Sequence, residues 1–197
     1  MNIPNMSTHT NRSCGYLEVI LGPMYSGKSS RLVEIYNQCI FCNIPVVVIN
    51  HEIDNRYDDT LLSTHDKRMI PCVKTSSLRK IWNKEDALAG DVILINEGQF
   101  FDDLYEVVRE MVSVGKQVYV CGLDGDFERN KFGQMLDLIP LCDTVTKLTS
   151  LCSLCKNGTK ALFSMRVTSE KEQTLVGSDN YKPVCRHCYE THYTQKN

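Results

Sequence analysis

Four short apolar segments recur in the first two thirds of the chain, separated by polar and glycine-containing stretches. They are YLEVIL, PVVVIN, DVILIN and QVYVCGL, at residues 16–21, 45–50, 91–96 and 117–123. Their short length and β-branched residues favour strands, and unbroken apolarity is typical of strands buried on both faces. The pattern therefore predicts a parallel sheet.

Between these segments the apolar residues follow a helical period. They take the i, i+3, i+4, i+7 spacing of one helix face over 32–39 and again over 104–111. Strand and helix thus alternate along the chain, which predicts an α/β fold, a parallel sheet with helices on both faces.

The pattern changes near residue 151, where cysteines and charged residues replace the apolar runs. LFSMRVT alternates and TLVGS follows a charged turn, so we expect a short hairpin or loop here between two cysteine pairs. The predicted organisation is a flexible N-terminal tail (1–15), an α/β domain (16–149), a small cysteine-containing domain (150–190) and a C-terminal tail (191–197).

Composition narrows the class of protein. Hydrophobic residues make up 42% and charged residues 23% of 197, as in ordinary globular proteins with a buried core. The net charge of −2 gives no overall positive potential to attract nucleic acid or anionic lipid. No apolar run reaches the roughly 18 residues of a membrane span. We therefore expect a cytoplasmic protein without a nucleic-acid or membrane partner.

The stretch GPMYSGKSS matches the phosphate-binding pattern GxxxxGK[ST] and lies between a predicted strand and a predicted helix. Backbone N–H groups at a helix N-terminus bind phosphate oxygens, Lys28 would reach the β and γ phosphates, and Ser29 would ligate Mg²⁺. The residues expected to bind ATP are Gly22, Pro23, Met24, Tyr25, Ser26, Gly27, Lys28, Ser29 and Ser30.

INEGQFFDD places Asn96 and Glu97 directly after the third predicted strand. Ligands of open α/β sheets bind at the carboxyl ends of the strands, where phosphoryl-transfer enzymes place carboxylates for Mg²⁺ and for the attacking hydroxyl. Asn96 offers the metal only a neutral amide oxygen, so we expect Glu97 to be the general base.

Four of the ten cysteines form two CxxC pairs, Cys152 with Cys155 and Cys185 with Cys188. Four thiolates complete a tetrahedral zinc site with no open position, which predicts a structural Zn²⁺. Disulfides, buried free thiols and a competing His187 ligand are the alternatives.

In order along the chain, these motifs resemble the type II thymidine kinase family of cytosolic and large-DNA-virus enzymes. The matching stretches are GPMYSGKSS, DNRY (54–57), THD (64–66), EGQFFDD (97–103), GLDGDFERNKFG (122–133), LIPLCDTVTKLT (138–149), both CxxC pairs and DNYKPVCRHCY (179–189). The resemblance covers about 16–190 and implies a P-loop NTPase-type sheet with a C-terminal zinc-binding lasso.

The resemblance implies transfer of the ATP γ-phosphate to the 5′-hydroxyl of thymidine, and also of deoxyuridine. It further implies Mg²⁺, structural zinc, a homotetramer and feedback inhibition by thymidine triphosphate. Glu97 would deprotonate the hydroxyl, Arg56 would stabilise the transferring group, and Asp54 would help to hold Mg²⁺. A simple ion pair between Arg56 and Asp54 is the alternative for these two residues.

The family's nucleoside pocket maps onto apolar and aromatic positions, and the loop between the CxxC pairs closes over the base. The substrate-binding residues implied in this way are Met24, Glu97, Phe100, Leu123, Phe127, Phe132 and Tyr181.

Three departures from the family pattern stand in this sequence. Asn96 replaces an Asp, Asp126 replaces a Thr and adds a negative charge near the nucleoside pocket, and Asn130-Lys131 replaces Lys-Pro. Asn96 motivates one alternative, a catalytically weakened nucleotide-binding relative. A zinc-ribbon NTPase that acts on nucleic acid is the other.

Overall fold

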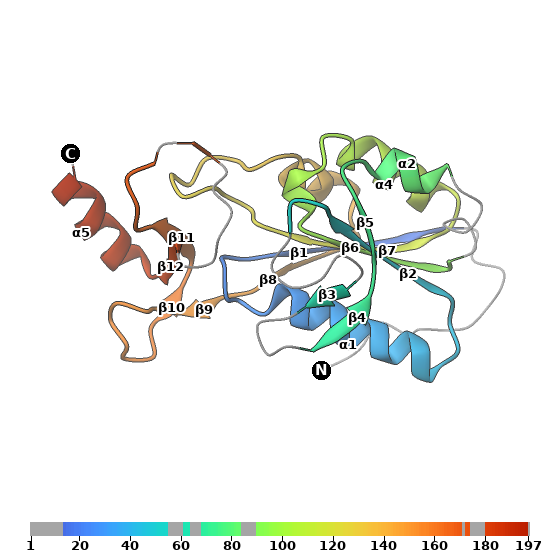
Figure 1. Cartoon of the computed structure of the whole chain (residues 1–197), viewed down its shortest axis with the longest axis horizontal. Helices are drawn as coiled ribbons and strands as arrows, with labels where there is room; N and C mark the ends of the chain where they lie inside the picture. The colour runs from blue at the N-terminus through green and yellow to red at the C-terminus, as the bar shows by residue number, and fades with distance from the viewer. Residues whose placement is uncertain are drawn as a thin grey trace.

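The computed structural model describes residues 14–54, 61–63, 68–83, 90–170, 172–173 and 180–196. The chain forms a large body around a central sheet and a smaller C-terminal unit, which lie at opposite ends of the long axis of the molecule (Figure 1). Among the helices in these ranges, none combines the length and apolarity needed to cross a membrane.

The central sheet has six strands, all parallel, in the order β5-β2-β6-β7-β1-β8. The four predicted strands occupy its middle, and their residues are almost all buried because helices cover both faces. Two strands that the apolar pattern did not predict, β5 and β8, form the edges. The bounds are β1 Tyr16–Leu21, β2 Val46–His51, β5 Val73–Thr75, β6 Val92–Asn96, β7 Gln117–Gly122 and β8 Thr144–Lys147.

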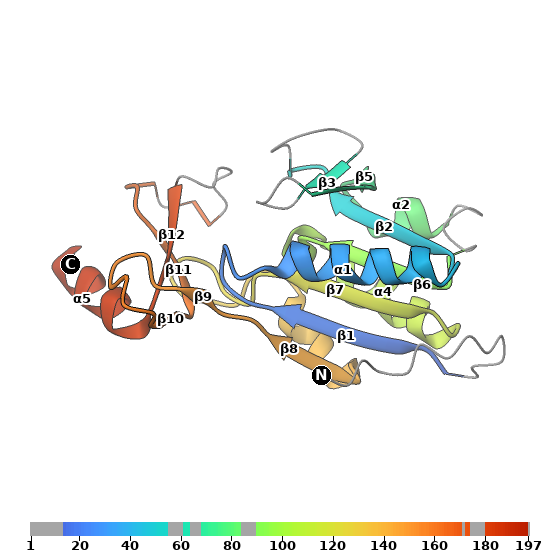
Figure 2. The same cartoon turned by 90° about the horizontal axis from the view of Figure 1, so that it is seen from below.

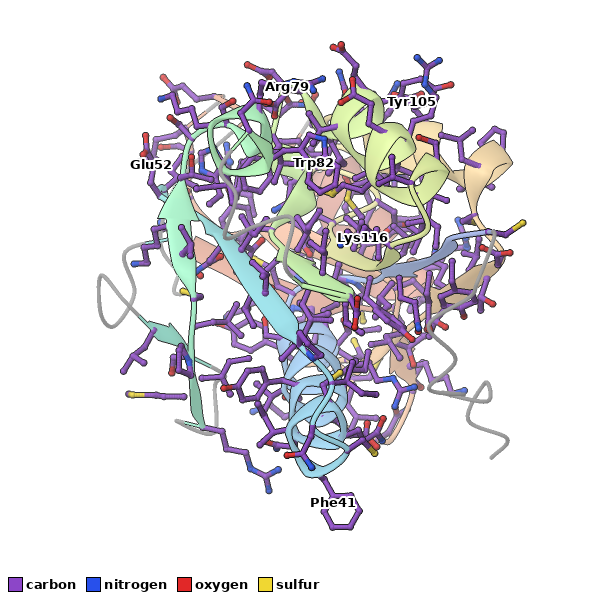
Figure 3. The ribbon with its side chains drawn as sticks, turned by 90° about the vertical axis from the view of Figure 1, so that its right-hand side faces the viewer. Phe41, Glu52, Arg79, Trp82, Tyr105 and Lys116 are labelled. Carbon is purple, nitrogen blue, oxygen red and sulfur yellow. The ribbon has the colours of Figure 1, made fainter. Side chains whose placement is uncertain are left out.

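Helices cover the two faces of this sheet, as the alternating pattern predicted. On one face lies α1 (Lys28–Phe41), and on the other lie α2 (Leu78–Trp82) and α4 (Leu104–Ser113), as the side view in Figure 3 shows. Trp82 of α2 packs into the core shared with α4. The predicted fold class, an α/β parallel sheet with helices on both faces, is confirmed.

Shorter elements complete the body. The 3₁₀ helix η1 (Gly98–Phe100) follows β6, and η2 (Met135–Leu141) packs beside α4. Strands β3 (Leu61–Ser63) and β4 (Met69–Pro71) form an antiparallel ribbon near α1 (Figure 1).

In the part of the C-terminal unit that the structure describes lie two small antiparallel sheets and one helix (Figure 2). Strand β9 (Ser150–Leu151) pairs with β10 (Lys160–Ala161), and α5 runs over Arg186–Lys196. Strand β11 (Phe163–Arg166) forms within the predicted alternating run, but it pairs with β12 (Tyr181–Val184). The expected partner, TLVGS, lies outside the described residues.

Helix α5 also continues through 191–196, where we expected a tail. The predicted domain boundaries themselves stay predictions.

Candidate active site

The phosphate-binding pattern forms the connection between β1 and α1. Gly27, with φ of 87°, takes the left-handed conformation that glycine favours, and its carbonyl accepts the Arg31 N–H at 2.9 Å. A Cβ on Gly22 would lie 2.8 Å from the carbonyl oxygen of Leu148, so no side chain fits there. The residues of the pattern therefore form a tight turn that opens a helix.

Two polar side chains of this loop are positioned for an anion. The Nζ of Lys28 folds back onto the carbonyl oxygen of Pro23 at 2.9 Å. The hydroxyl of Ser26 is buried and makes no hydrogen bond within the described residues. A phosphate oxygen would supply the partner that this buried hydroxyl lacks, so the loop fits a triphosphate.

A chain of polar side chains connects this loop to the ends of β6 and β2. The Ser29 hydroxyl donates to Oδ1 of Asn96 at 3.2 Å, and Nδ2 of Asn96 donates to Oδ1 of Asn50 at 2.9 Å. Nδ2 of Asn50 then donates to the Asp54 carboxylate at 3.1 Å. Oδ1 of Asn96 also accepts the Cys121 thiol at 3.0 Å. The structure thus brings together three predicted residues, Ser29, Asn96 and Asp54.

The donor set at this point fits a hard cation. Hydroxyl and carboxylate oxygens are the ligands that Mg²⁺ prefers, and Ser29 and Asp54 offer one of each. The amide oxygen of Asn96 already accepts two hydrogen bonds, which occupy both of its lone pairs. Ser29 and Asp54 are therefore the residues that would hold the ion, and Asn96 would act through its hydrogen bond to Ser29.

Glu97 follows Asn96 with φ of 54° and ψ of 42°, a left-handed conformation that is rare outside glycine. Gln99 holds its carboxylate: Nε2 of Gln99 donates to Glu97 at 2.6 Å, while Oε1 of Gln99 accepts the Leu123 N–H at 3.0 Å. A Cβ on Gly122 would lie 2.6 Å from Oε1 of Gln99, so glycine leaves room for this bridge. Glu97 and Leu123, both predicted site residues, are joined through Gln99.

Two predicted aromatic residues pack next to Glu97. The rings of Phe100 and Phe132 meet edge to face with centroids 5.5 Å apart, and the ring of His51 lies 5.6 Å from Phe100. Burial lowers the pKa of His51, and neighbouring carboxylates, Glu97 among them, oppose this shift only in part. These rings form an apolar surface of the kind that suits a flat base.

The other two predicted aromatics lie around a buried arginine. The guanidinium of Arg166 lies 3.8 Å from the ring centroid of Phe127 and 5.1 Å from that of Tyr181, and it also donates to the Tyr181 hydroxyl. The same group donates to the carbonyl oxygens of Glu170, Glu172 and Gln173. Arg166 thus contacts both rings and holds residues that follow β11, in the middle of the segment between the cysteine pairs.

Asp126 has a different role from the one its charge suggested. Its buried carboxylate accepts the backbone N–H groups of Glu128 and Asn130, both at 2.9 Å, and the side-chain amide of Gln173 at 2.8 Å. The backbone N–H of Asp126 in turn donates to the carbonyl oxygen of Asn130 at 2.9 Å. Asp126 therefore holds a turn and ties it to the C-terminal unit.

Two further hydrogen bonds join the C-terminal unit to the site. The backbone N–H of Met24, in the phosphate loop, donates to the hydroxyl of Ser164 at 2.8 Å. The Tyr189 hydroxyl donates to the carbonyl oxygen of Phe127 at 2.7 Å. Both predicted substrate residues are thus held from β11 and α5.

The four predicted cysteines converge in the C-terminal unit. Their sulfur atoms all lie within 4.8 Å of one another, and Cys155 Sγ lies 3.5 Å from Cys185 Sγ and 3.2 Å from Cys188 Sγ. Tetrahedral Zn–S bonds of about 2.3 Å place sulfurs roughly 3.8 Å apart, so the cluster fits zinc. All four are free thiols, and His187 is not in this group.

The surroundings of Cys152 favour the thiolate that a metal requires. Burial disfavours its charged form, but backbone N–H groups, first that of Cys155 and then those of Cys185 and Leu154, outweigh burial and lower its pKa to about 6. The neighbouring sulfurs of Cys188 and Cys185 raise the pKa of Cys155. The protonated Cys155 thiol is stabilised by hydrogen bonds to these sulfurs, and a cation that takes the place of its proton would bind the resulting thiolate.

Sequence reasoning missed several residues of this site, and Arg56 lies outside the described residues. One signal was available for Asn50: it sits at the carboxyl end of β2, next to Asn96 in the register of the sheet. No comparable signal marks the others, because their partners are distant in the sequence and are brought together only by the fold. The missed residues are Asn50, Gln99, Cys121, Ser164, Arg166 and Gln173.

Comparisons with known proteins agree with this site. A family model described as "Thymidine kinase" matches residues 15–189. The thymidine kinase of Yaba monkey tumor virus is 41% identical over 180 residues, covering 91% of this chain and 97% of the relative.

Cellular relatives match over a similar length. The cytosolic thymidine kinase of Bos taurus is 39% identical and that of Homo sapiens 37%, each over 191 residues. Both alignments cover 96% of this chain, with 78% of the bovine and 80% of the human protein. From the phosphate loop, the residues after β6 and the cysteine cluster together with these matches, we conclude that the chain belongs to the thymidine kinase family.

Proposed function

We propose that this protein transfers the γ-phosphate of ATP to the 5′-hydroxyl of thymidine, and also of deoxyuridine. The observation that carries the proposal is the position of Glu97. This residue directly follows Asn96, the last residue of β6, and Asn96 contacts Ser29 of the phosphate loop. Gln99 holds the carboxylate of Glu97 in place. A carboxylate beside a triphosphate site can accept the proton of an attacking hydroxyl.

Each group has a defined role in this proposal. The loop N–H groups, Ser26 and Lys28 bind the phosphates, and Mg²⁺ held by Ser29 and Asp54 would neutralise charge on them. Glu97 takes the proton from the 5′-hydroxyl. Phe100, Phe132, Phe127 and Tyr181 contact the nucleoside. Arg56 supplies a guanidinium to the transferring group, a role taken from the family motif alone.

The metal of the cysteine cluster is structural in this proposal. Four thiolates leave no open coordination position, so the ion stabilises the unit that holds Phe127 and Tyr181 and takes no part in the chemistry. The name of the bovine relative supports a cytoplasmic location. A homotetramer and inhibition by thymidine triphosphate are part of the proposal through the family resemblance alone.

The test is formation of thymidine monophosphate from thymidine and ATP with Mg²⁺, for the wild type and for Glu97→Gln. Removal of a general base costs about 100- to 10,000-fold in turnover, so we expect at least a hundredfold loss. Glu106→Gln, an exposed position on α4, is the matched control and should retain full activity. Product formation that survives in Glu97→Gln would remove Glu97 from the role of base.

The same assay separates the alternative reading, a weakened nucleotide-binding relative. That reading requires a zinc-loaded wild type that binds ATP but forms no product. Turnover within the range of about 1–100 s⁻¹ that is typical of kinases would contradict it.

A further inference from the structure

We propose that Asn50 is a positioning residue for metal-bound ATP. Asn50 and Asn96 form an amide relay, a chain of hydrogen bonds through which the Asp54 carboxylate sets the orientation of the Ser29 hydroxyl. The relay is defined as Ser29, Asn96, Asn50 and Asp54. This inference rests on the proposed function, because it concerns the metal and triphosphate site of that reaction.

The relay is built into the sheet. Asn50 and Asn96 are direct neighbours in the register of β2 and β6, and each is only 1% exposed. Their amides are 2.9 Å apart, and the two ends of the relay are closed by contacts of 3.1 Å to Asp54 and 3.2 Å to Ser29. Buried amides at this position must satisfy one another, so their orientation is tightly defined.

The charge of Asp54 fixes the direction of every hydrogen bond. An ionised carboxylate only accepts, so Asn50 must turn its NH₂ group toward Asp54 and its oxygen toward Asn96. Asn96 must then turn its NH₂ group toward Asn50, which leaves its oxygen facing Ser29 and Cys121. A charge at one end thus produces an acceptor at the other end.

This direction matters for a hydroxyl that is to ligate a cation. Such a hydroxyl must point its proton away from the metal and present its lone pairs to it. The oxygen of Asn96 takes the proton of Ser29, so the lone pairs of Ser29 are available to Mg²⁺. Asn96 performs this function without a charge of its own.

The relay also explains how the site manages without a carboxylate at position 96. A second carboxylate here would be buried beside the oxygen of Asn50, and a buried charge facing an acceptor is costly. Instead the single negative charge of the relay sits on half-buried Asp54, at its outer end. Asn50 and Asn96 therefore form a matched pair.

The test is a double-mutant cycle of Asn50→Leu and Asp54→Asn. The affinity for ATP is measured by calorimetry without thymidine, once with Mg²⁺ and once with excess chelator. We expect Asn50→Leu to weaken binding of Mg²⁺-ATP about tenfold, and metal-free ATP less than about twofold. Asp54→Asn should weaken Mg²⁺-ATP about thirtyfold, and the double variant by a similar amount, because both changes break one relay. Asn37→Leu, exposed on α1, is the matched control and should bind like the wild type.

Two results would overturn the relay: losses that multiply to about three-hundredfold in the double variant, or equal losses with and without Mg²⁺. Should Asn50→Leu not fold, Asn96→Asp provides the second arm, since it retains the volume of the side chain. Asn50 must then turn its NH₂ group toward position 96 and lose Asp54. In that background Asp54→Asn should cost only about threefold, the part that comes from its own contact with Mg²⁺, and a full loss of about thirtyfold there would contradict the proposal.

These measurements are separate from the test of the proposed function. Binding of ATP is measured without thymidine, so a wild type that binds Mg²⁺-ATP but phosphorylates no thymidine would refute the reaction and leave the relay result standing.

Discussion

The sheet body and the C-terminal unit are stabilised in different ways. The body buries two apolar clusters, one on each face of the sheet, with eighteen and twelve buried residues. Among the described residues of the C-terminal unit there is one cluster of five buried residues, and two of these are cysteines of the metal group. The body has a hydrophobic core of ordinary size, whereas the C-terminal unit depends on its metal site.

The contrast teaches where catalysis is vulnerable. The phosphate loop and Glu97 belong to the body. Phe127 and Tyr181, in contrast, are held by Arg166 and Tyr189 of the C-terminal unit. Stability and substrate binding are therefore separable, and perturbations of the two regions should give different phenotypes.

The largest effect is expected from loss of the metal. Cys185→Ser, or removal of zinc with a chelator, should unfold the C-terminal unit and reduce thymidine phosphorylation by about a hundredfold or more. The body should retain its far-ultraviolet circular dichroism and its binding of ATP. Cys42→Ser, at an exposed body position, is the control. Joint loss of ATP binding and activity would mean that the two regions are not separable.

The converse perturbation weakens the body. Leu94→Ala truncates a fully buried side chain of β6 and should lower the free energy of unfolding by about 2–5 kcal/mol, measured with urea. Zinc content should stay at one ion per chain, because the cluster lies outside this core. Leu151→Ala, at a side chain 65% exposed, should change stability by no more than about 0.5 kcal/mol. A zinc content that fell with Leu94→Ala would contradict the contrast.

A smaller effect is expected at the contact between the regions. Tyr189→Phe removes one hydrogen bond, to the carbonyl oxygen of Phe127, which is worth about 1 kcal/mol. The KM for thymidine should rise about fivefold, while the affinity for ATP stays the same. Tyr105→Phe, on α4 of the body, should leave both constants unchanged (Figure 3). An equal rise in the KM for ATP would place Tyr189 in a general structural role.

The smallest effect concerns pH. Since burial lowers the pKa of His51 below its ordinary 6.5, the folded protein binds this proton less readily than the unfolded chain. Stability should be constant above about pH 7 and should fall as the pH drops below 6.5. His51→Asn should flatten this decline in urea titrations, whereas His192→Asn, at an exposed position on α5, should not. A slope that is identical in His51→Asn would exclude this residue as its source.

The two regions also differ in how far the sequence predicted them. Strands β1, β2, β6 and β7 follow from unbroken apolar runs, because burial on both faces leaves a strong local pattern. The edge strands were missed: β5 has three residues, and three of the four residues of β8 are exposed. The cysteine pairs predicted the metal group. The pairing of β11 with β12 was not predicted, because an alternating pattern indicates a strand but not its partner.

Within the site, the sequence predicted the residues that carry the chemistry better than those that position them. Lys28, Ser29 and Glu97 sit in motifs with a fixed spacing. Gln99 and Asn50 act through side-chain contacts with Leu123 and Asn96, which are distant in the sequence and are brought together only by the fold.

The hydrogen bond from the Met24 N–H to the Ser164 hydroxyl connects the phosphate loop directly to β11. A shift of the loop on nucleotide binding would displace this contact with β11, and binding at the two places would then be energetically linked. Such linkage is reciprocal: the factor by which ATP changes the affinity for thymidine equals the factor by which thymidine changes the affinity for ATP. One backbone N–H and one serine hydroxyl thus give the two substrates a route to cooperativity.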